Sequence, residues 1–503
     1  MGFGAGDQGK LRRVAPAFFG KSPAGAADEA RELLIAEETM DPIAEDFFPP
    51  MPARLEETGL NVKFVSALLF RSMYLLGLET NVAIAAQLRL GQGIVDDLLG
   101  KLKQQGFIEI KGFEGADSRV ARYSLTTAAR DLAIESARQC EYVGPLPVPL
   151  AQYQEQVVRQ GLANEQISME RLASALSHLV LPASVIRRLG PAVNSGQSLL
   201  IYGPPGNGKS SISEAIGRAF AQPIFIPHCV EVDGQVIRVY DPTVHEEIRE
   251  EKSGAGDYRE LLKKRPDPRW TRCRRPVVVT GGELTLEMLD LDFDQTAKFY
   301  EAPPQMKAIG GVFIIDDFGR QLVRPKDLLN RWIIPLERRV DYLKLHTGKK
   351  FDVPFDELVI FSTNLSPREL MDPGLMRRVK YKLHLDPPSM ADYVSIFQGV
   401  CRRREMDLPD EILSWLLEDF YPRHGGSCAA FHPAFIVEHA EATCRYMGRE
   451  PRLTRDLVAD ALENLFLVER APGASAPGAS APESSAPESS APAVGSARAE
   501  RAS

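Results

Sequence analysis

The strongest chemical signal in the sequence is a glycine-rich loop that ends in a lysine and a serine. The loop follows the pattern GxxxxGK[ST] and consists of Gly203, Pro204, Pro205, Gly206, Asn207, Gly208, Lys209 and Ser210, with Ser211 opening the next segment. Glycines have no Cβ, so backbone N–H groups can converge on phosphate oxygens. The Lys209 ammonium would bind the β- and γ-phosphates, and the Ser210 hydroxyl would be a ligand of Mg²⁺. The loop therefore predicts a site for ATP and Mg²⁺.

Two acidic residues follow an apolar run about 100 residues later. The run Val312–Ile315 leads directly into Asp316 and Asp317. Such a strand is buried on both faces of a parallel sheet, and its carboxyl end opens onto the ligand crevice. We expect Asp316 to hold Mg²⁺, directly or through water, and Asp317 to polarise the attacking water. The alternative for Asp317 is an N-cap of the following turn.

A third polar residue stands at the end of another expected strand. Leu358–Thr363 is rich in β-branched and aromatic residues, and Asn364 follows it. Asparagine after a strand is often only a turn residue. Its position after the acidic strand favours a role at the phosphate site.

The elements around these residues predict an α/β fold. Leu199–Tyr202 is a short apolar run before the glycine-rich loop, and Ser211–Phe220 has the character of a helix after it. Strands and helices alternate from about residue 145 to 385, which predicts a parallel sheet flanked by helices.

The string GPPGNGKS, the acidic strand and the later asparagine together resemble the AAA+ P-loop ATPases. The resemblance implies that Asp316 and Asp317 are the Walker B acids and that Asn364 is sensor 1, which orients the lytic water. It also implies an α-helical lid after the core. Family members usually carry glutamate where this chain has Asp317. Aspartate is one methylene shorter, and a misplacement of about 1 Å can cost about 100-fold in rate, so slow hydrolysis is expected.

The resemblance extends to an arginine pair in the segment DPGLMRRV. There Arg377 or Arg378 corresponds to an arginine finger, which enters a neighbouring subunit's site and neutralises charge on the transferred phosphoryl group. The sequence does not separate the two, and the alternative is that both are ordinary surface arginines. A finger implies a homo-oligomer, as a ring or partial ring. No arginine opens the third lid helix, so sensor 2 is either absent or replaced by His432 or Arg423.

The N-terminal part of the chain resembles winged-helix domains. Helices are expected at Val62–Leu76, Asn81–Leu88 and Gly93–Gln105, then a hairpin of Phe107–Lys111 and Arg119–Leu125. DNA binding is the functional interpretation of that pattern. Basic and acidic residues are nearly balanced there, and Asp96 and Asp97 stand where base contacts would lie. Protein docking is therefore favoured over nucleic-acid binding.

These segments define the expected organisation: an AAA+ core with an α-helical lid and an N-terminal winged-helix-like α+β domain. The expected boundaries are a poorly ordered leader (1–57), the winged-helix-like domain (58–137), linker helices (138–178), the nucleotide-binding domain (179–387), the lid (388–470) and a disordered Ala/Pro/Ser tail (471–503).

Three additions to the core are candidates for contact with other molecules. Val230–Val239 and Arg339–Phe355 are each expected to form a hairpin, the second directly before the Asn364 strand. Such a hairpin resembles the pre-sensor-1 insertion of some AAA+ groups. Lys263–Arg275 places seven cations around Trp270 and could bind nucleic acid, an acidic partner or only solvent.

The bulk composition is that of a soluble globular chain. Hydrophobic residues make up 44% and charged residues 25%, with a formal net charge of −8. The six cysteines show no CxxC spacing, and neither a signal peptide nor a membrane span is expected, so we expect a cytoplasmic protein.

The leading functional hypothesis is an ATPase that remodels an unknown protein client. The alternatives are a DNA-associated ATPase or regulator, and a nucleotide-dependent binding switch with little turnover.

Overall fold

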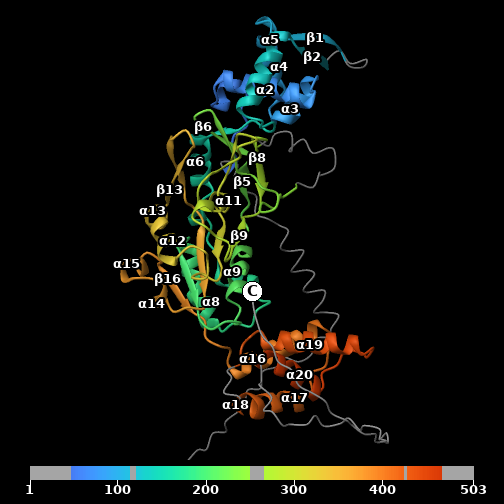
Figure 1. Cartoon of the computed structure of the whole chain (residues 1–503), viewed down its shortest axis with the longest axis vertical. Helices are drawn as coiled ribbons and strands as arrows, with labels where there is room; N and C mark the ends of the chain where they lie inside the picture. Colours follow the sequence, from blue (N-terminus) through green and yellow to red (C-terminus); the bar gives the residue numbers. More distant parts are fainter. Residues whose placement is uncertain (1–46, 114–119, 250–265, 424–427, 467–503) are drawn as a thin grey trace, which may run out of the picture.

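The structure is a computed structural model that describes residues 47–113, 120–249, 266–423 and 428–466. Its three parts follow one another along the long axis of the molecule (Figure 1): an N-terminal helical domain, a central α/β unit and a C-terminal helical unit.

The tail expected at 471–503 lies outside the described residues, as do residues 1–46 of the expected leader. Residues 47–57 of that leader are packed instead: Leu55 is buried and the Phe48 ring contacts that of Phe225. The prediction of poor order was wrong there because these apolar side chains reach the core.

The centre of the molecule is a five-stranded, fully parallel sheet, as predicted. Its strand order is β16-β4-β15-β12-β9. The strands are β4 (Leu199–Tyr202), β9 (Val277–Thr280), β12 (Val312–Ile315), β15 (Leu358–Thr363) and β16 (Tyr381–His384). The flanking helices are α7 (Met169–Ala175), α8 (Ala183–Ser195), α9 (Lys209–Arg218), α11 (Pro304–Lys307), α12 (Pro325–Arg331), α13 (Ile333–Arg338), α14 (Pro367–Leu370) and α15 (Pro373–Met376).

Both faces of this sheet are buried, which explains the continuous apolar runs. Alternate residues of a strand point to opposite faces. In β4, Leu199 and Ile201 therefore join a core with α7, α8 and α9, whereas Leu200 joins a second core around Trp332 at the end of α12. Thr363 at the end of β15 is paired with Tyr202 at the end of β4. The carboxyl ends of the central strands therefore meet at one edge.

A second group of strands extends the α/β unit toward the N-terminal domain. One mixed sheet has the order β10-β11-β7-β6-β3, and two strand pairs are separate from it. The elements are β3 (Val148–Pro149), α6 (Leu150–Arg159), β5 (Ile224–Pro227), β6 (Cys229–Val232), β7 (Gln235–Arg238), β8 (Trp270–Cys273), β10 (Asp292–Phe293), β11 (Tyr300–Glu301), β13 (Val340–Lys344) and β14 (Lys350–Pro354). The segment 138–178, expected as linker helices, thus contributes a strand, β3, to this sheet.

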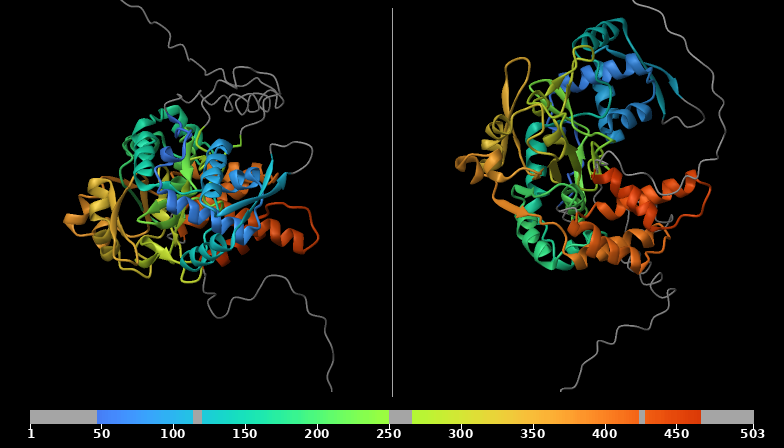
Figure 2. Two further views of the ribbon diagram at one scale, coloured as in Figure 1. Left: turned by 90° about the horizontal axis from the view of Figure 1, so that it is seen from above. Right: turned by 60° about the horizontal axis from the view of Figure 1, so that its bottom comes forward.

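Both predicted hairpins are present. β6 and β7 are antiparallel and turn at Asp233 and Gly234, which have φ values of 53° and 79°. β13 and β14 are antiparallel and directly precede β15. Both views of Figure 2 place the gold β13–β14 hairpin and the blue N-terminal helices on different sides of the green strands. The β13–β14 hairpin therefore lies away from the N-terminal helices, although its apolar residues share a core with β6 and β7.

The N-terminal domain has the predicted order of three helices, a two-stranded antiparallel hairpin and a further helix. Its elements are the 3₁₀ turn η2 (Leu55–Thr58), α2 (Val62–Leu76), α3 (Asn81–Leu88), α4 (Gln92–Gln104), β1 (Ile108–Phe113), β2 (Ala121–Leu125) and α5 (Thr127–Gln139). The Thr80 side chain caps α3 by accepting from Ala83 N, as expected.

Arg269 connects the N-terminal domain to the α/β unit. Its guanidinium is 1% exposed and forms an ion pair with Asp267. It also donates to Thr58 O and Pro147 O, each at 3.3 Å, and to Gln152 Oε1 at 3.2 Å. One buried side chain therefore joins Thr58 of the N-terminal domain to residues 147–152 of the α/β unit.

The C-terminal unit is helical, as predicted. It consists of α16 (Met390–Arg403), α17 (Asp410–Ser414), the π-helical turn η5 (Trp415–Phe420), α18 (Tyr421–Arg423), α19 (His432–Tyr446) and α20 (Arg455–Phe466), which share one core. Among the described residues, no helix combines the length and the apolar character that crossing a lipid bilayer requires.

Candidate functional site

The glycine-rich loop connects β4 to α9 at the carboxyl edge of the central sheet. Three of its glycines have left-handed φ values: 147° at Gly203, 77° at Gly206 and 81° at Gly208. A Cβ at Gly203 would lie 2.2 Å from Leu385 O. The loop therefore needs glycine both for its backbone conformation and for its packing.

Lys209 is directed into this loop. It is 7% exposed, and its Nζ donates to Gly203 O at 3.0 Å and to Pro204 O at 2.9 Å. Nζ also donates to Asn364 Oδ1 at 2.6 Å. Burial lowers the pKa of Lys209 below its ordinary value, while the Asp317 and Asp316 carboxylates oppose that shift. The loop thus holds a lysine amine beside its own carbonyl groups, where phosphate oxygens would lie.

Ser210 and Asp316 lie together beneath the loop. The Ser210 hydroxyl donates to Asp316 Oδ2 at 2.7 Å. A hydroxyl and a carboxylate oxygen are the hard ligands that Mg²⁺ prefers, and this ion usually keeps several waters. The two residues therefore fit the predicted metal-binding role.

Asp317 and Asn364 complete the cluster. Asn364 Nδ2 donates to Asp317 Oδ1 at 3.3 Å while its Oδ1 accepts from Lys209. Asn364 thus bridges the lysine and the second acid, as its predicted place at the strand tip requires. Among the described residues, the Asp317 carboxylate accepts a hydrogen bond from Asn364 and does not cap the following turn, so the alternative N-cap role is not observed.

The remaining residues of the loop are either exposed or contact other parts of the protein. Pro204 and Pro205 are exposed, and Ser211 is exposed at the start of α9. Asn207 is 6% exposed, and its Oδ1 accepts from Ala430 N at 3.2 Å. Asn207 therefore contacts the C-terminal helical unit instead of facing solvent.

The structure distinguishes the two arginines that the sequence left equivalent. Arg378 donates to Glu337 Oε1 at 2.7 Å and to Gly374 O at 3.0 Å, so it holds its own subunit together. Arg377 is exposed, and no described residue pairs with it. Arg377 is therefore the one available to a second chain.

The C-terminal unit contacts the loop through a residue that the sequence did not single out. Phe431 N donates to Gly206 O at 3.0 Å, and a Cβ on Gly206 would lie 2.1 Å from Phe431 Cδ1. No arginine opens this helix, and sensor 2 was expected to be either absent or replaced by His432 or Arg423; the one sequence signal for Phe431 was its position at the start of α19.

Neither of the two expected cationic substitutes reaches the loop. His432 is 5% exposed, and its Nδ1 accepts from Tyr421 Oη at 2.9 Å. Burial lowers the pKa of His432 to about 4, so its ring is neutral. Arg423 pairs with Asp419 within the C-terminal unit. The suggestion of either residue as sensor 2 finds no support, because both are engaged inside that unit.

The basic stretch before β9 is structural in its described part, residues 266–275. Trp270 is 6% exposed in the core, and Arg275 forms a buried ion pair with Glu165 at 2.9 Å. Lys263, Lys264 and Arg265 lie outside the described residues. The suggestion that this stretch stacks on nucleic acid around Trp270 was wrong, because the indole is not accessible.

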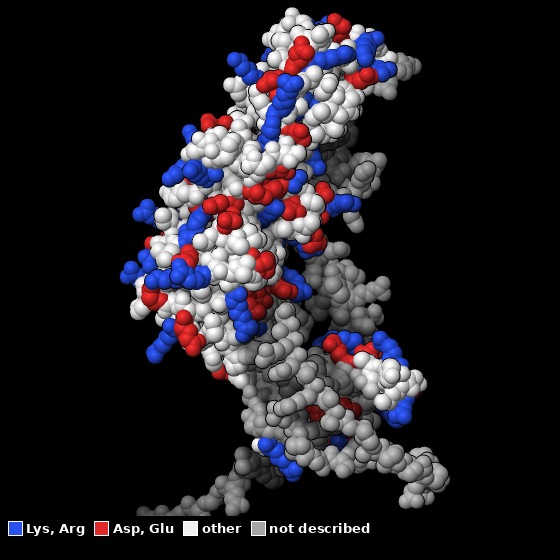
Figure 3. Space-filling view, in the orientation of Figure 1, with Lys and Arg blue, Asp and Glu red and all other residues white. Residues whose placement is uncertain are grey.

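The N-terminal domain shows the same balance of charges. Lys111 and Arg122 on the hairpin both pair with Glu79, and Asp96 accepts from Asn81 Nδ2 at 2.7 Å. Figure 3 shows blue and red residues intermixed over this domain and the α/β unit on the face in view. On this face the described residues form no basic patch of the kind that favours phosphate contacts.

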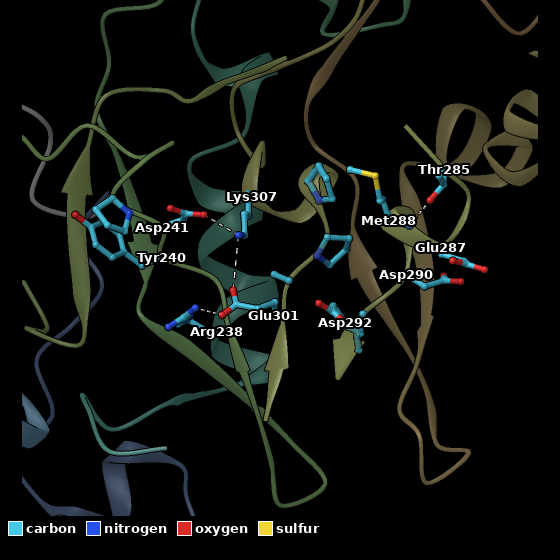
Figure 4. Close-up of a pocket in the computed structure, with 15 residues that line it drawn as sticks. Arg238, Tyr240, Asp241, Thr285, Glu287, Met288, Asp290, Asp292, Glu301 and Lys307 are labelled. Atoms are coloured by element: carbon cyan, nitrogen blue, oxygen red, sulfur yellow. Dashed lines mark hydrogen bonds and ion pairs between the residues drawn. The ribbon is translucent and has the colours of Figure 1, made fainter. Parts of the chain in front are cut away.

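A separate polar cavity of about 810 Å³ lies among β7, β10, β11 and α11. Figure 4 shows Lys307 between Asp241 and Glu301, and Arg238 beside Glu301. The carboxylates of Glu287, Asp290 and Asp292 line the opposite side. Its two cations, Arg238 and Lys307, pair with Glu301 and Asp241, and none of the sequence-predicted site residues lines it.

Comparisons with known proteins give remote likenesses. A family model described as a domain of unknown function, DUF8689, matches residues 389–464, which form most of the C-terminal helical unit. No curated protein matches the chain. Similar solved structures include NtrX from Brucella abortus in complex with ADP (16% identity, TM-score 0.36, 60% of this chain and 59% of that chain). A RuvB mutant from Thermotoga maritima is 13% identical with a TM-score of 0.31, over 60% of this chain and 72% of that chain. Domain III of the Thermotoga maritima replication initiation protein DnaA is 13% identical with a TM-score of 0.33, over 58% of this chain and 96% of that chain.

This chain therefore spans less than two thirds of the NtrX chain. Its own coordinates show a P-loop α/β core, with a five-stranded parallel sheet flanked by helices and a lysine-bearing glycine loop at the sheet's carboxyl edge.

Proposed function

We propose that this chain is an ATPase of the AAA+ type that binds ATP with Mg²⁺ and hydrolyses it to ADP and phosphate. One observation carries the proposal: Lys209, Ser210, Asp316, Asp317 and Asn364, from three different strand ends, form one hydrogen-bonded cluster. Structural ion pairs do not require glycines with left-handed backbones beside them. A loop whose backbone N–H groups converge on phosphate favours such glycines.

Each residue of the cluster has a distinct task in this proposal. The loop N–H groups and Lys209 bind the phosphates, and Ser210 and Asp316 hold Mg²⁺, which neutralises charge on the triphosphate. Asp317 accepts a proton from, or orients, the attacking water, and Asn364 fixes that carboxylate by its hydrogen bond. Lys209 exchanges its bonds to the loop carbonyls for bonds to phosphate.

Isothermal calorimetry and phosphate release on the purified chain test this proposal. Wild type should bind Mg·ATP and Mg·ADP and release phosphate, Lys209→Ala should lose binding, and Asp317→Asn should bind without turnover. Exposed Lys380 provides a matched control, because Lys380→Ala removes a cation from a neighbouring loop. Absence of any heat of binding with folded wild type would contradict the proposal.

We further propose that turnover remodels a protein partner through a homo-oligomer. Exposed Arg377 supports a site shared between subunits, and the β13–β14 hairpin directly precedes the β15 strand that ends at Asn364. Movement at the phosphate site can thus reach the hairpin through one strand. Mass photometry with and without ATP tests the assembly, and a mass that stays monomeric with ATP argues against it.

A nucleotide-dependent switch with little turnover is the second candidate. Asp317 supports it, because its carboxylate is shorter than the usual glutamate and is already engaged by Asn364. Binding of Mg·ATP without phosphate release over several hours would favour the switch over the motor.

A further inference from the structure

We propose that Gln321 is a positioning residue that sets the Asp317 carboxylate for its role in ATP hydrolysis. The proposal rests on the function proposed above and concerns the turn that follows β12. That turn contains Asp316, Asp317, Phe318 and Gly319.

Asp317 has an unusual backbone conformation. Its φ is 48°, in the left-handed region, where a residue with a Cβ is disfavoured. Such a conformation persists where neighbouring contacts determine it, and it occurs often at functional sites. Contacts near Asp317 must therefore hold the turn.

Gln321 provides two of these contacts, one on each side of Asp317. Its Nε2 donates to Asp316 O at 2.8 Å, and its Oε1 accepts from Gly319 N at 2.8 Å. The side-chain amide thus spans the turn and fixes the residues before and after the acid. Both of these bonds end on the backbone of the turn, so the effect of Gln321 on the acid passes through the turn.

A second set of bonds fastens the same turn to the neighbouring strand. Thr363 Oγ1 donates to Phe318 O at 2.6 Å, and Phe318 N donates to Ser362 O at 2.7 Å. These bonds locate the turn relative to β15, whereas the Gln321 bonds set its internal geometry. Without the Gln321 bonds, Asp317 can relax to an ordinary backbone and move its carboxylate away from Asn364.

Position matters most for a short acid. A misplacement of about 1 Å at a reacting group can cost about 100-fold in rate. We therefore expect Gln321→Met, which keeps the length of the side chain but cannot form either bond, to lower kcat by about 10- to 100-fold. Nucleotide affinity should change less than about twofold, because the loop, Lys209 and Ser210 are untouched.

A double-mutant cycle tests the proposal on the full chain. Single-turnover phosphate release would be measured for wild type, Gln321→Met, Asp317→Asn and the double variant, with Mg·ADP affinity and Tm recorded for each. Gln321→Ala gives an independent second variant. Arg324→Ala is the matched control, because Arg324 is on the same loop and its exposed side chain bonds only to Asp327 among described residues.

If Gln321 acts through Asp317, its loss has no further effect once Asp317 is asparagine, so the two effects are not additive. Three results would overturn the positioning role but not the proposed ATPase. They are wild-type turnover in both Gln321 variants, additive effects in the cycle, and loss of Mg·ADP binding in both Gln321 variants. A wild type that releases phosphate no faster than Lys209→Ala is a different result, because it overturns the proposed ATPase and the positioning role with it.

Discussion

The Lys209 ammonium and the Asn364 amide oxygen lie 2.6 Å apart, although 155 residues separate them in the sequence. They meet because β4 and β15 are adjacent parallel strands whose last residues, Tyr202 and Thr363, are paired. Asn364 in turn donates to Asp317 from the next strand, β12. Three strand ends therefore share one polar cluster, and the first predictions concern its members.

Lys209→Ala should weaken Mg·ATP binding at least about 30-fold, or about 2 kcal/mol, because it removes a buried charged donor. Calorimetry measures the change directly. Lys380→Ala should bind as wild type does. Equal affinity of Lys209→Ala and wild type would show that the loop does not hold the phosphates.

Asp317→Asn should retain nucleotide binding and lose about 10²- to 10⁴-fold in phosphate release, the usual contribution of a positioned acid or base. Asparagine has the same shape, so Asn364 keeps a partner at 3.3 Å. Single-turnover phosphate release with radiolabelled ATP detects the residual rate. Unchanged turnover would remove Asp317 from the mechanism.

Arg377→Ala and Arg378→Ala should behave differently. Arg377→Ala should lower turnover by about 10³-fold or more without changing Tm, as expected for a finger that enters another subunit. Arg378→Ala should lower stability by about 1 kcal/mol, because it breaks the contact with Glu337. Phosphate release and thermal unfolding of both variants measure the two effects.

A mixing experiment separates the finger role from damage to the variant's own site. Lys209→Ala lacks a functional loop but supplies Arg377, whereas Arg377→Ala has an intact loop. If the site is shared, mixing the two inactive variants should recover part of the activity. No recovery in mixed oligomers would place Arg377 outside a shared site.

Gly206→Ala should disturb the C-terminal helical unit more than the loop. The new Cβ would lie 2.1 Å from Phe431 Cδ1, so that unit must move, and the φ of 77° adds strain. Phe431→Ala in the same chain should restore part of the lost stability, since it removes the clash but not the backbone strain. Thermal unfolding of both variants checks this, and identical Tm values for the single and double variants would show that the two residues do not touch.

Acidification should weaken the C-terminal unit through His432. Burial lowers its pKa to about 4 in the folded chain, whereas the unfolded chain has the ordinary value of about 6.5. As the pH falls from about 6.5 toward 4, His432 takes up a proton in the unfolded state but not in the folded state. The free energy of unfolding therefore decreases over this pH window. Above about pH 6.5 His432 causes no such loss.

Urea unfolding of wild type and His432→Phe at about pH 7 and pH 5 measures this effect. Wild type should lose more stability than His432→Phe over that interval. The pKa of His228 is also lowered to about 4 by burial, but it is present in both chains and cancels. An equal loss in both chains would assign the pH dependence elsewhere.

The phosphate loop, its strands and the two hairpins were predictable from the sequence because each is encoded locally. Turn residues such as Asp233 and Gly234, the cap Thr80 and the apolar run of β12 determine their own structure within a few residues. The meeting of Lys209 with Asn364 was also predictable, because parallel strands place their carboxyl ends at one edge.

Hydrogen bonds that form only once a turn or two units have taken their folded positions were not predictable. Gln321 and Phe431 are ordinary residues in the sequence, and their importance comes from their hydrogen bonds to Asp316 O and Gly206 O in the folded chain. The basic stretch around Trp270 was misjudged for the same reason, because its burial depends on strands far away in the sequence.

The buried guanidinium of Arg269 has a mechanical consequence. It donates to Thr58 O at the base of the N-terminal domain, and to Pro147 O beside β3 and Gln152 Oε1 on α6 of the α/β unit. A domain joined only by a loose linker would move independently, whereas a domain fastened in this way, and sharing a core with Cys229 and Val236, should turn with the α/β unit as one body.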